Sequence, residues 1–142
     1  MNPTLTAHAT VTINAPPSTV WNALVNPELI QQYLFGTEVV ADWKVGNPII
    51  WKGVWEGKPY EDKGRILEFV PEKRLVTTHW SPLSGTPDVP ENYHTVTYEL
   101  APEDGGTKLT LTQDNNATEE EKYHSEQYWK MVLGGIKKLL EG

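Results

Sequence analysis

The stretch YWKMVLGGIKKLLEG, residues 128–142, decides the fold, because it has the pattern of an amphipathic helix with two adjacent glycines at its centre. Each glycine weakens a helix by roughly 1 kcal/mol relative to alanine. Spacing the side chains at 100° per residue places Tyr128, Val132 and Gly135 on one face and Gly134 on the opposite side. The partner of this helix therefore determines whether Gly135 allows close packing or leaves an open space.

The helix is expected to begin well before this stretch. Thr118, followed three residues later by Glu121, is typical of a capping box at a helix start. A helix from there to Glu141 would be about 35 Å long at 1.5 Å per residue, enough to cross a sheet. Glu121 and Ser125 lie on the same face as Val132, and polar groups are costly in a dry core. We therefore expect a cavity, or its mouth, near the amino-terminal half of the helix.

The preceding segments predict strands and two short helices. Thr6–Ile13 alternates between small or apolar and polar residues, which is typical of a strand with one buried face. A helix capped by Ser18 follows, and Asn26-Pro27 separates it from a second. Short turns then join six strand-like segments, as in an antiparallel meander. These segments are residues 38–43, 49–55, 64–70, 74–80, 93–100 and 108–113, and the charged stretch 60–64 is interpreted as a solvated hairpin end.

This order predicts an α+β helix-grip fold. A curved antiparallel sheet would wrap around the long C-terminal helix, and two short helices would follow the first strand. The 142 residues are expected to form a single domain, residues 1–142, that buries roughly two thirds of its unfolded surface.

Composition narrows the class of function. The chain has no cysteine, which excludes disulfides and thiolate chemistry. Twelve Lys and Arg against nineteen Asp and Glu give a net charge of −7 without a basic stripe, so no nucleic acid partner is expected. The first residues lack the pattern of a signal peptide, and no apolar run is long enough for membrane insertion. A cytoplasmic location is expected.

Strand parity indicates which side chains face the helix. The inward set is predicted to be His94, Val96, Tyr98, Leu100, Leu109, Leu111 and Gln113. Trp51 and Trp55 flank Gly53, and Trp80 ends a neighbouring strand. These rings either form ordinary core or surround a binding space, and both interpretations remain open. The long segment from Ser81 to His94 is either a lid over the cavity or a surface insertion.

Candidates for catalysis and metal binding are few. The spacing of the histidines allows a metal site only if His79 and His94 meet across strands with a carboxylate such as Glu121. Glu121 with His94 or His124 could form an acid–base pair. The polar stretch 113–116 either presents groups at the cavity mouth or ends its strand through side-chain turns. No catalytic residue, metal site or cofactor is predicted.

The whole chain resembles the START-like (SRPBCC) helix-grip superfamily, and within it the branch named after the activator of the 90-kDa heat-shock protein ATPase. The matching stretches, in order, are VTINAPPSTVWNALVNPELIQQYLFG, EVVADWKVGNPIIWKG, GRILEFVPEKRLVTTHW, GTKLTLTQDN and WKMVLGGIKKLLE. The resemblance implies a deep, largely apolar cavity between the terminal helix and the sheet, which the superfamily uses to hold lipids, sterols, polyketides and similar molecules.

The leading hypothesis is a small-molecule binding protein that holds a hydrophobic ligand in this cavity. The alternatives are a cyclase- or hydrolase-type enzyme that uses Glu121 and a histidine as acid and base, and a chaperone-regulating or other protein-interaction module. The residues expected to contact the ligand are Trp51, Trp55, Trp80, His94, Tyr98, Gln113, Ser125, Tyr128, Val132 and Gly135.

Overall fold

The computed structural model describes residues 5–141, apart from the side chain of Trp55. The strands are β1 Leu5–Ile13, β2 Glu38–Ala41, β3 Pro48–Trp55, β4 Lys58–Val70, β5 Arg74–His79, β6 His94–Glu103 and β7 Gly106–Asn116. The helices are α1 Pro17–Val25, α2 Pro27–Tyr33 and α3 Glu119–Glu141, with short 3-10 helices η1 Pro82–Ser84 and η2 Pro90–Asn92. This is the predicted α+β order.

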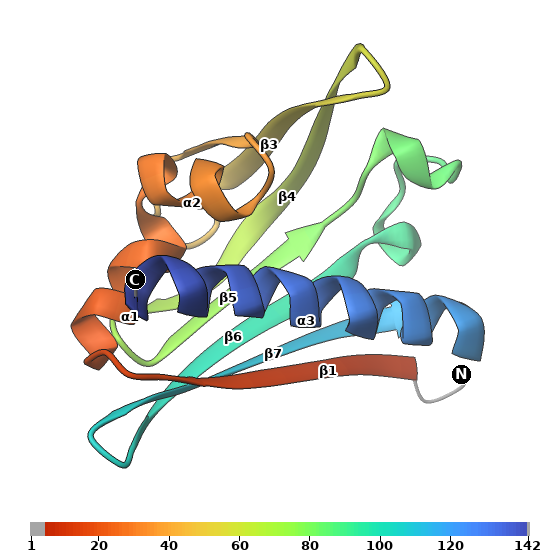
Figure 1. Ribbon diagram of the computed structural model, residues 1–142. Coiled ribbons are helices and arrows are strands. Elements are labelled where there is room, and N and C mark those ends of the chain that lie inside the picture. Colours follow the sequence, from red (N-terminus) through yellow and green to blue (C-terminus); the bar gives the residue numbers. More distant parts are fainter. Residues whose placement is uncertain (1–4, 142) are drawn as a thin grey trace.

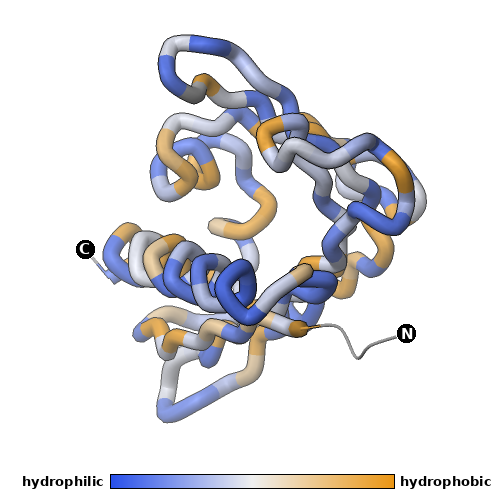
Figure 2. The backbone as a smooth tube through the Cα atoms, turned by 90° about the vertical axis from the view of Figure 1, so that its right-hand side faces the viewer, coloured by the Kyte–Doolittle hydropathy of each residue, from blue (hydrophilic) through white to orange (hydrophobic). Residues whose placement is uncertain are grey.

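The strands form one antiparallel sheet in the order β1-β7-β6-β5-β4-β3-β2. Helix α3 crosses the sheet and packs mainly on β1 and β7, while α1 and α2 lie near its carboxy-terminal end (Figure 1). Seen from the side, the sheet curls around the interior rather than lying flat (Figure 2). The predicted helix-grip architecture is confirmed.

Local sequence explains the helix boundaries. The Thr118 hydroxyl accepts a hydrogen bond from the backbone N–H of Glu121 at 3.0 Å, which confirms the predicted cap of α3. Asn26 caps α2 in the same way through Glu28. The predicted cap at Ser18 is wrong, because α1 begins at Pro17 and the residue before it offers no side-chain acceptor. A proline at the first helical position has its φ already set for a helix.

The buried face of α3 is rotated from the predicted one. Val132, Leu133 and Ile136 are at most 1% exposed, although Leu133 was not expected to face inward. Tyr128, expected inside, is 41% exposed. The rotation follows from the position of α3, which lies over the β1 edge of the sheet. The face of the helix that carries Tyr128 therefore points toward α2 and the strands farther from β1.

The inward strand residues include the predicted apolar ones. Leu109 and Leu111 are fully buried, and Val96 and Leu100 are nearly so. One prediction fails here: residues 60–64 do not end a hairpin but lie within β4. Tyr60 and Asp62 on this strand are half-buried, while Glu61 and Lys63 are exposed, so the charged stretch alternates as a strand does.

Candidate functional site

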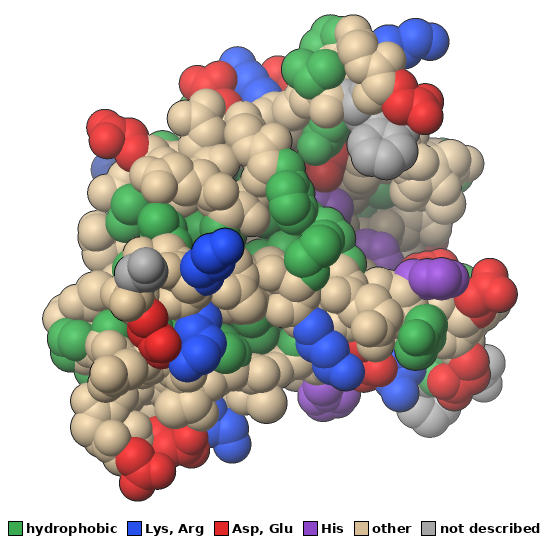
Figure 3. Space-filling model, viewed as in Figure 1, with side chains coloured by type: hydrophobic (Ala, Val, Ile, Leu, Met, Phe, Trp, Pro, Cys, Tyr) green, Lys and Arg blue, Asp and Glu red, His purple; other side chains and the backbone are tan. Residues whose placement is uncertain are grey.

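A cavity of about 640 Å³ lies between the amino-terminal half of α3 and strands β3 to β7. Figure 3 shows a hollow on this side of the molecule, above α3, with histidine side chains visible in its depth. The helix contributes Glu121, Tyr128 and Trp129 to the lining. This position agrees with the expectation that the cavity lies near the start of the last helix.

Aromatic rings line much of the cavity. They come from β3, β4, β6, α3 and the end of β5, and they are Trp51, Tyr60, Trp80, Tyr98, Tyr128 and Trp129. The rings pack against one another at their edges: Tyr98 meets Trp129 with centroids 6.4 Å apart, and Tyr128 meets Trp129 at 5.1 Å. Edge-to-face pairs of this kind are favourable arrangements of aromatic rings. The aromatic part of the lining is therefore a packed, largely apolar surface.

Six of the ten residues expected at the ligand lie around this cavity: Trp51, Trp80, His94, Tyr98, Gln113 and Tyr128. Ser125, Val132 and Gly135 do not line it. The tenth, Trp55, has its side chain outside the described part of the structure. Contact of any of these residues with a ligand stays a prediction.

Gly135 and Val132 serve the packing of α3. A Cβ atom at Gly135 would lie 3.5 Å from the Cβ of Tyr33 on α2, while nothing lies within 4 Å of the same atom at Gly134. Val132 is 1% exposed and belongs to the core. Of the two explanations for Gly135, close approach of another element therefore fits the structure, although that element is α2 and not the sheet.

Gln113 and Ser125 belong to a hydrogen-bond network that joins α3 to β7. The indole N–H of Trp129 donates to Gln113 Oε1 at 2.6 Å, and Gln113 Nε2 donates to Ser125 Oγ at 3.3 Å. Ser125 Oγ in turn donates to Asn116 Oδ1 at 3.0 Å. The polar groups of Ser125 and Trp129 on α3 are thus satisfied by the protein, which leaves few of their donors and acceptors for a ligand.

The stretch 113–116 also orders its neighbours. The Asp114 carboxylate accepts from the backbone N–H of Thr95 at 2.5 Å, and Asn115 Nδ2 donates to the backbone oxygens of Glu91 and Tyr93. Of the two open interpretations of this stretch, the first fits better: Gln113 and Asn115 line the cavity, and the side chains of Asp114 and Asn115 bond to other segments and not within a local turn. The strand itself runs on to Asn116, three residues past its predicted end.

A carboxylate–imidazole pair in the cavity was missed by sequence reasoning. Asp62 Oδ2 lies 2.9 Å from His79 Nε2, and the two side chains are 15% and 30% exposed. The ring of His79 also meets the ring of Trp51, with centroids 5.0 Å apart. The alternation of Tyr60, Asp62 and Gly64 with Glu61 and Lys63 was the signal that could have revealed Asp62 as an inward residue.

The acid–base pair expected at Glu121 is not formed in this conformation. Glu121 and His94 both line the cavity, but within residues 5–141 no hydrogen bond joins Glu121 to a histidine. His94 Nδ1 instead lies 2.8 Å from the backbone oxygen of Asp114, and since a carbonyl only accepts, this nitrogen carries the hydrogen. His79 and His94 are partners across β5 and β6. Even so, the described residues contain no cluster of three metal-binding side chains.

The segment between β5 and β6 borders the cavity. Residues of both η1 and η2 line it, and the segment is tied to the sheet by an ion pair between Lys63 and Asp88. The Tyr93 hydroxyl donates to Asp88 at 2.6 Å, and the rings of Trp80 and Tyr93 stack with centroids 6.4 Å apart. A role as a lid stays a prediction.

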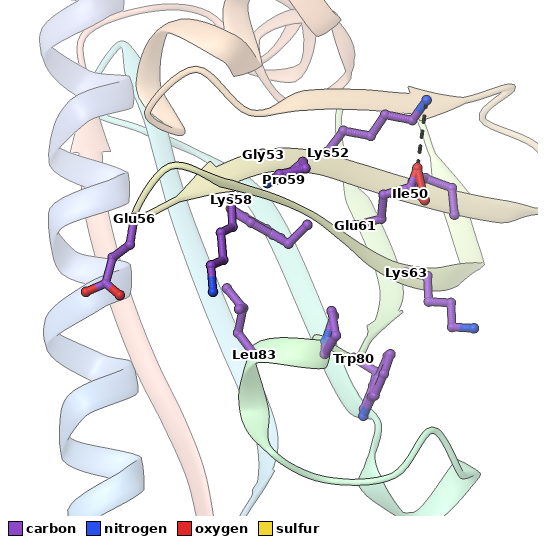
Figure 4. A pocket seen from close by; sticks show the side chains of 12 residues that line it. Ile50, Lys52, Gly53, Glu56, Lys58, Pro59, Glu61, Lys63, Trp80 and Leu83 are labelled. Atoms are coloured by element: carbon purple, nitrogen blue, oxygen red, sulfur yellow. Dashed lines mark ion pairs between the residues drawn. The ribbon is translucent and has the colours of Figure 1, made fainter.

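A wider groove of about 1010 Å³ adjoins the cavity on the side of the β3–β4 hairpin. Tyr60, Trp80 and Leu83 line both spaces. Figure 4 shows Leu83 and Trp80 below the hairpin, with the Lys52–Glu61 ion pair on its strands. Gly53 makes room here, because a Cβ atom at this position would lie 2.5 Å from the Tyr60 hydroxyl. Tyr60 therefore lies at the boundary between the groove and the cavity.

Two phenols of the lining, those of Tyr98 and Tyr128, have raised pKa values. Burial raises the pKa of Tyr128 to about 12, and the nearby Tyr60 and Asp62 add to the shift. Burial, with a smaller contribution from Tyr128, raises the pKa of Tyr98 further. No hydrogen bond from the Tyr98 hydroxyl to another described residue is present, so this O–H is a free donor at the cavity.

An antiparallel sheet curled around a long last helix, with a cavity between them, defines a START-like helix-grip protein. The family model described as Activator of Hsp90 ATPase homolog 1-like protein matches residues 14–141. The chain belongs to this family. Within residues 5–141, no helix has the length and apolar character needed to cross a membrane.

Solved structures are similar over nearly the whole chain. ChR145 from Cytophaga hutchinsonii is 55% identical, with a TM-score of 0.87 over 99% of this chain and 97% of that one. MLL2253 from Mesorhizobium loti is 23% identical, with a TM-score of 0.78 over 96% of each chain. The Aha1 dimer from Colwellia psychrerythraea is 18% identical, with a TM-score of 0.74 over 96% of each chain. A comparison with proteins of curated function returned no match.

Proposed function

We propose that this protein binds a small, largely apolar molecule in the cavity between α3 and the sheet. The observation that carries the proposal is a 640 Å³ space lined by aromatic rings. Protein sites for small molecules have volumes of about 300–1,000 Å³ and combine apolar walls with a few polar groups. The cytoplasmic location expected from the sequence stays a prediction.

Polar groups that lack a protein partner support this proposal. Thr77 and Tyr98 line the cavity, and neither hydroxyl makes a hydrogen bond with the rest of the described chain. Both hydroxyls are therefore available to a ligand with one polar end.

Binding can be tested with a thermal-shift screen against fatty acids, sterols, flavonoids and aromatic polyketides. A ligand at 100 times its Kd adds about 2.7 kcal/mol to the free energy of unfolding. Replacement of Ala117, a small residue of the lining, by tryptophan narrows the space and should weaken the response. Ala101→Trp, on an exposed part of β6, is the matched control.

A saturable rise in Tm that Ala117→Trp reduces and Ala101→Trp leaves intact would support the proposal. If no compound shifts the Tm of the wild type, or if both variants respond like the wild type, the cavity is not the binding site. In the latter case a ligand must bind elsewhere on the surface.

The Asp62–His79 pair favours a second candidate function, acid–base catalysis on a molecule held in the same cavity. If His79 Nε2–H donates to Asp62, the other ring nitrogen of a neutral imidazole is left as a proton acceptor. The test is hydrolysis of a panel of aryl esters: His79→Gln should abolish any activity, with Glu121→Gln as a comparison. Equal activity in wild type and His79→Gln would rule this function out.

The third alternative, contact with a chaperone, stays a prediction that agrees with the description of the family. An exposed apolar group close to the cavity is available for such a contact: Phe35 is 67% exposed, Met131 is 54% exposed, and Phe35 meets the ring of Tyr128 at 6.5 Å. Retention of the wild type but not of Phe35→Ser by immobilised Hsp90 would support it.

A further inference from the structure

The charged groups around the cavity all have the same sign. Its lining includes three carboxylates, Asp62 from β4, Glu91 from η2 and Glu121 from α3, and among the described residues no lysine or arginine lines it. Two cations on β4, the strand that carries Asp62, have other partners. Lys63 pairs with Asp88, and Arg65 donates to the backbone oxygen of Gly46 at 2.9 Å. A ligand in the cavity therefore meets negative charge without a compensating cation of the chain, unless a histidine is protonated.

Asp62 carries the strongest indication that a donor is missing. One carboxylate oxygen, Oδ2, is paired with His79, while Oδ1 is buried and has no hydrogen-bond partner among the described residues. A carboxylate oxygen without a donor in a site of low polarity is unfavourable. A ligand N–H group that reached Asp62 would make a charge-assisted hydrogen bond, which is stronger than a neutral one.

The surroundings of Asp62 suit a cation more than a neutral donor. Trp51 is the cross-strand partner of Asp62, and its ring lies against His79. Aromatic faces attract ammonium groups through their quadrupole, most strongly for tryptophan. Carboxylate, imidazole and indole thus lie together at this end of the cavity.

We infer that the ligand of this cavity carries a protonated amine, which binds at Asp62, while its apolar body lies against the aromatic lining. The inference rests on the proposed binding function and narrows its ligand class. It also disfavours fatty acids and other carboxylates, since their charge would meet three carboxylates of the protein.

The test compares three ligands of nearly equal size: 2-(2-naphthyl)ethylamine, 2-(2-naphthyl)ethanol and 2-naphthylacetate. Their Kd values are measured by calorimetry at pH 8 in low salt. The amine is expected to bind about tenfold more tightly than the alcohol, and the carboxylate more weakly than both. Asp62→Asn keeps the shape of the side chain and should bring the amine to the affinity of the alcohol. Glu120→Gln, on the exposed side of α3, should leave all three Kd values unchanged.

The outcomes separate this inference from the proposed function. If the alcohol binds in the cavity and the amine binds no more tightly, the charge preference is wrong and the binding function stands. If none of the three binds and the wider screen also fails, the binding function itself is wrong. A preference for the amine that survives in Asp62→Asn, with the variant folded by circular dichroism, would overturn the role of Asp62.

Discussion

The Cβ position of Gly135 lies 3.5 Å from the Cβ of Tyr33, so α3 and α2 meet at the glycine itself. This is an ordinary van der Waals distance, so the methyl group of an alanine fits here, and only the further atoms of a longer side chain can crowd Tyr33. Tyr33 is held in place by its hydroxyl, which donates to the backbone oxygen of Ala23 at 2.8 Å. Gly135 therefore lies at the contact between α2 and α3.

Leucine substitutions at the two adjacent glycines should have opposite effects on the free energy of unfolding. Gly135→Leu is expected to lower the free energy of unfolding by about 1–3 kcal/mol, because the new side chain must displace Tyr33. Gly134→Leu meets nothing within 4 Å and is expected to raise it by about 0.5–1 kcal/mol through helix propensity. Urea unfolding of both variants measures the difference. Equal effects at the two positions would contradict the contact with Tyr33.

Gly64 is expected to tolerate no side chain. A Cβ atom there would overlap the backbone carbonyl oxygen of Thr78 on β5, and a backbone oxygen cannot rotate away. Gly64→Ala should lower the free energy of unfolding by about 3 kcal/mol, measured by urea unfolding. Gly134→Ala, a glycine with open space around it, is the matched control and should stabilise the protein. An unchanged midpoint for Gly64→Ala would mean that β4 and β5 are farther apart than described here.

The bond between Trp129 and Gln113 should contribute measurably to the docking of α3. Trp129→Phe leaves Gln113 Oε1 without its 2.6 Å donor and is expected to cost about 1–3 kcal/mol, in addition to lost ring contacts. Gln127→Ala, on the exposed side of the same helix, should change stability by less than about 0.5 kcal/mol. If Trp129→Phe costs no more than Gln127→Ala, the bond contributes nothing measurable to the docking of α3.

Stability should fall at alkaline pH through the tyrosines of the cavity. The pKa of Tyr128 is about 12 in the folded protein and near the ordinary 10 in the unfolded chain. Between these values the folded state binds more protons, so the free energy of unfolding decreases as pH rises from about 10 to 12. Below pH 10 the contribution is fully present. Tyr128→Phe should remove one late step from the absorbance titration at alkaline pH, and an unchanged titration would contradict the shift.

Features set by local periodicity were predicted well. The cap of α3 at Thr118 and the inward pair Leu109 and Leu111 depend only on residues a few positions apart, and the structure agrees with them. The role of Ser125 was harder to predict, because a polar residue on an inward helix face can find its hydrogen-bond partners on another element. Its partners Gln113 and Asn116 belong to β7, and no sequence spacing shows that they meet.

The Asp62–His79 pair shows why part of the site could not be predicted. Charged residues are rarely inward in strands, so the stretch 60–64 resembles a turn. What brings Asp62 to His79 is the pairing of β4 with β5 and the space left by the curl of the sheet, both of which are tertiary properties. The alternation along the strand indicated which residues share a face, but not that this face borders a cavity.

Strand β1 has a single neighbour in the described sheet, β7, and Thr10 on it bonds to Leu109, 99 residues along the chain. During synthesis β1 therefore cannot find its native partner until β7, about a hundred residues later, has left the ribosome. Because α3 packs on β1, the grip can close only after α3 has followed. Long-range pairing of this kind slows folding.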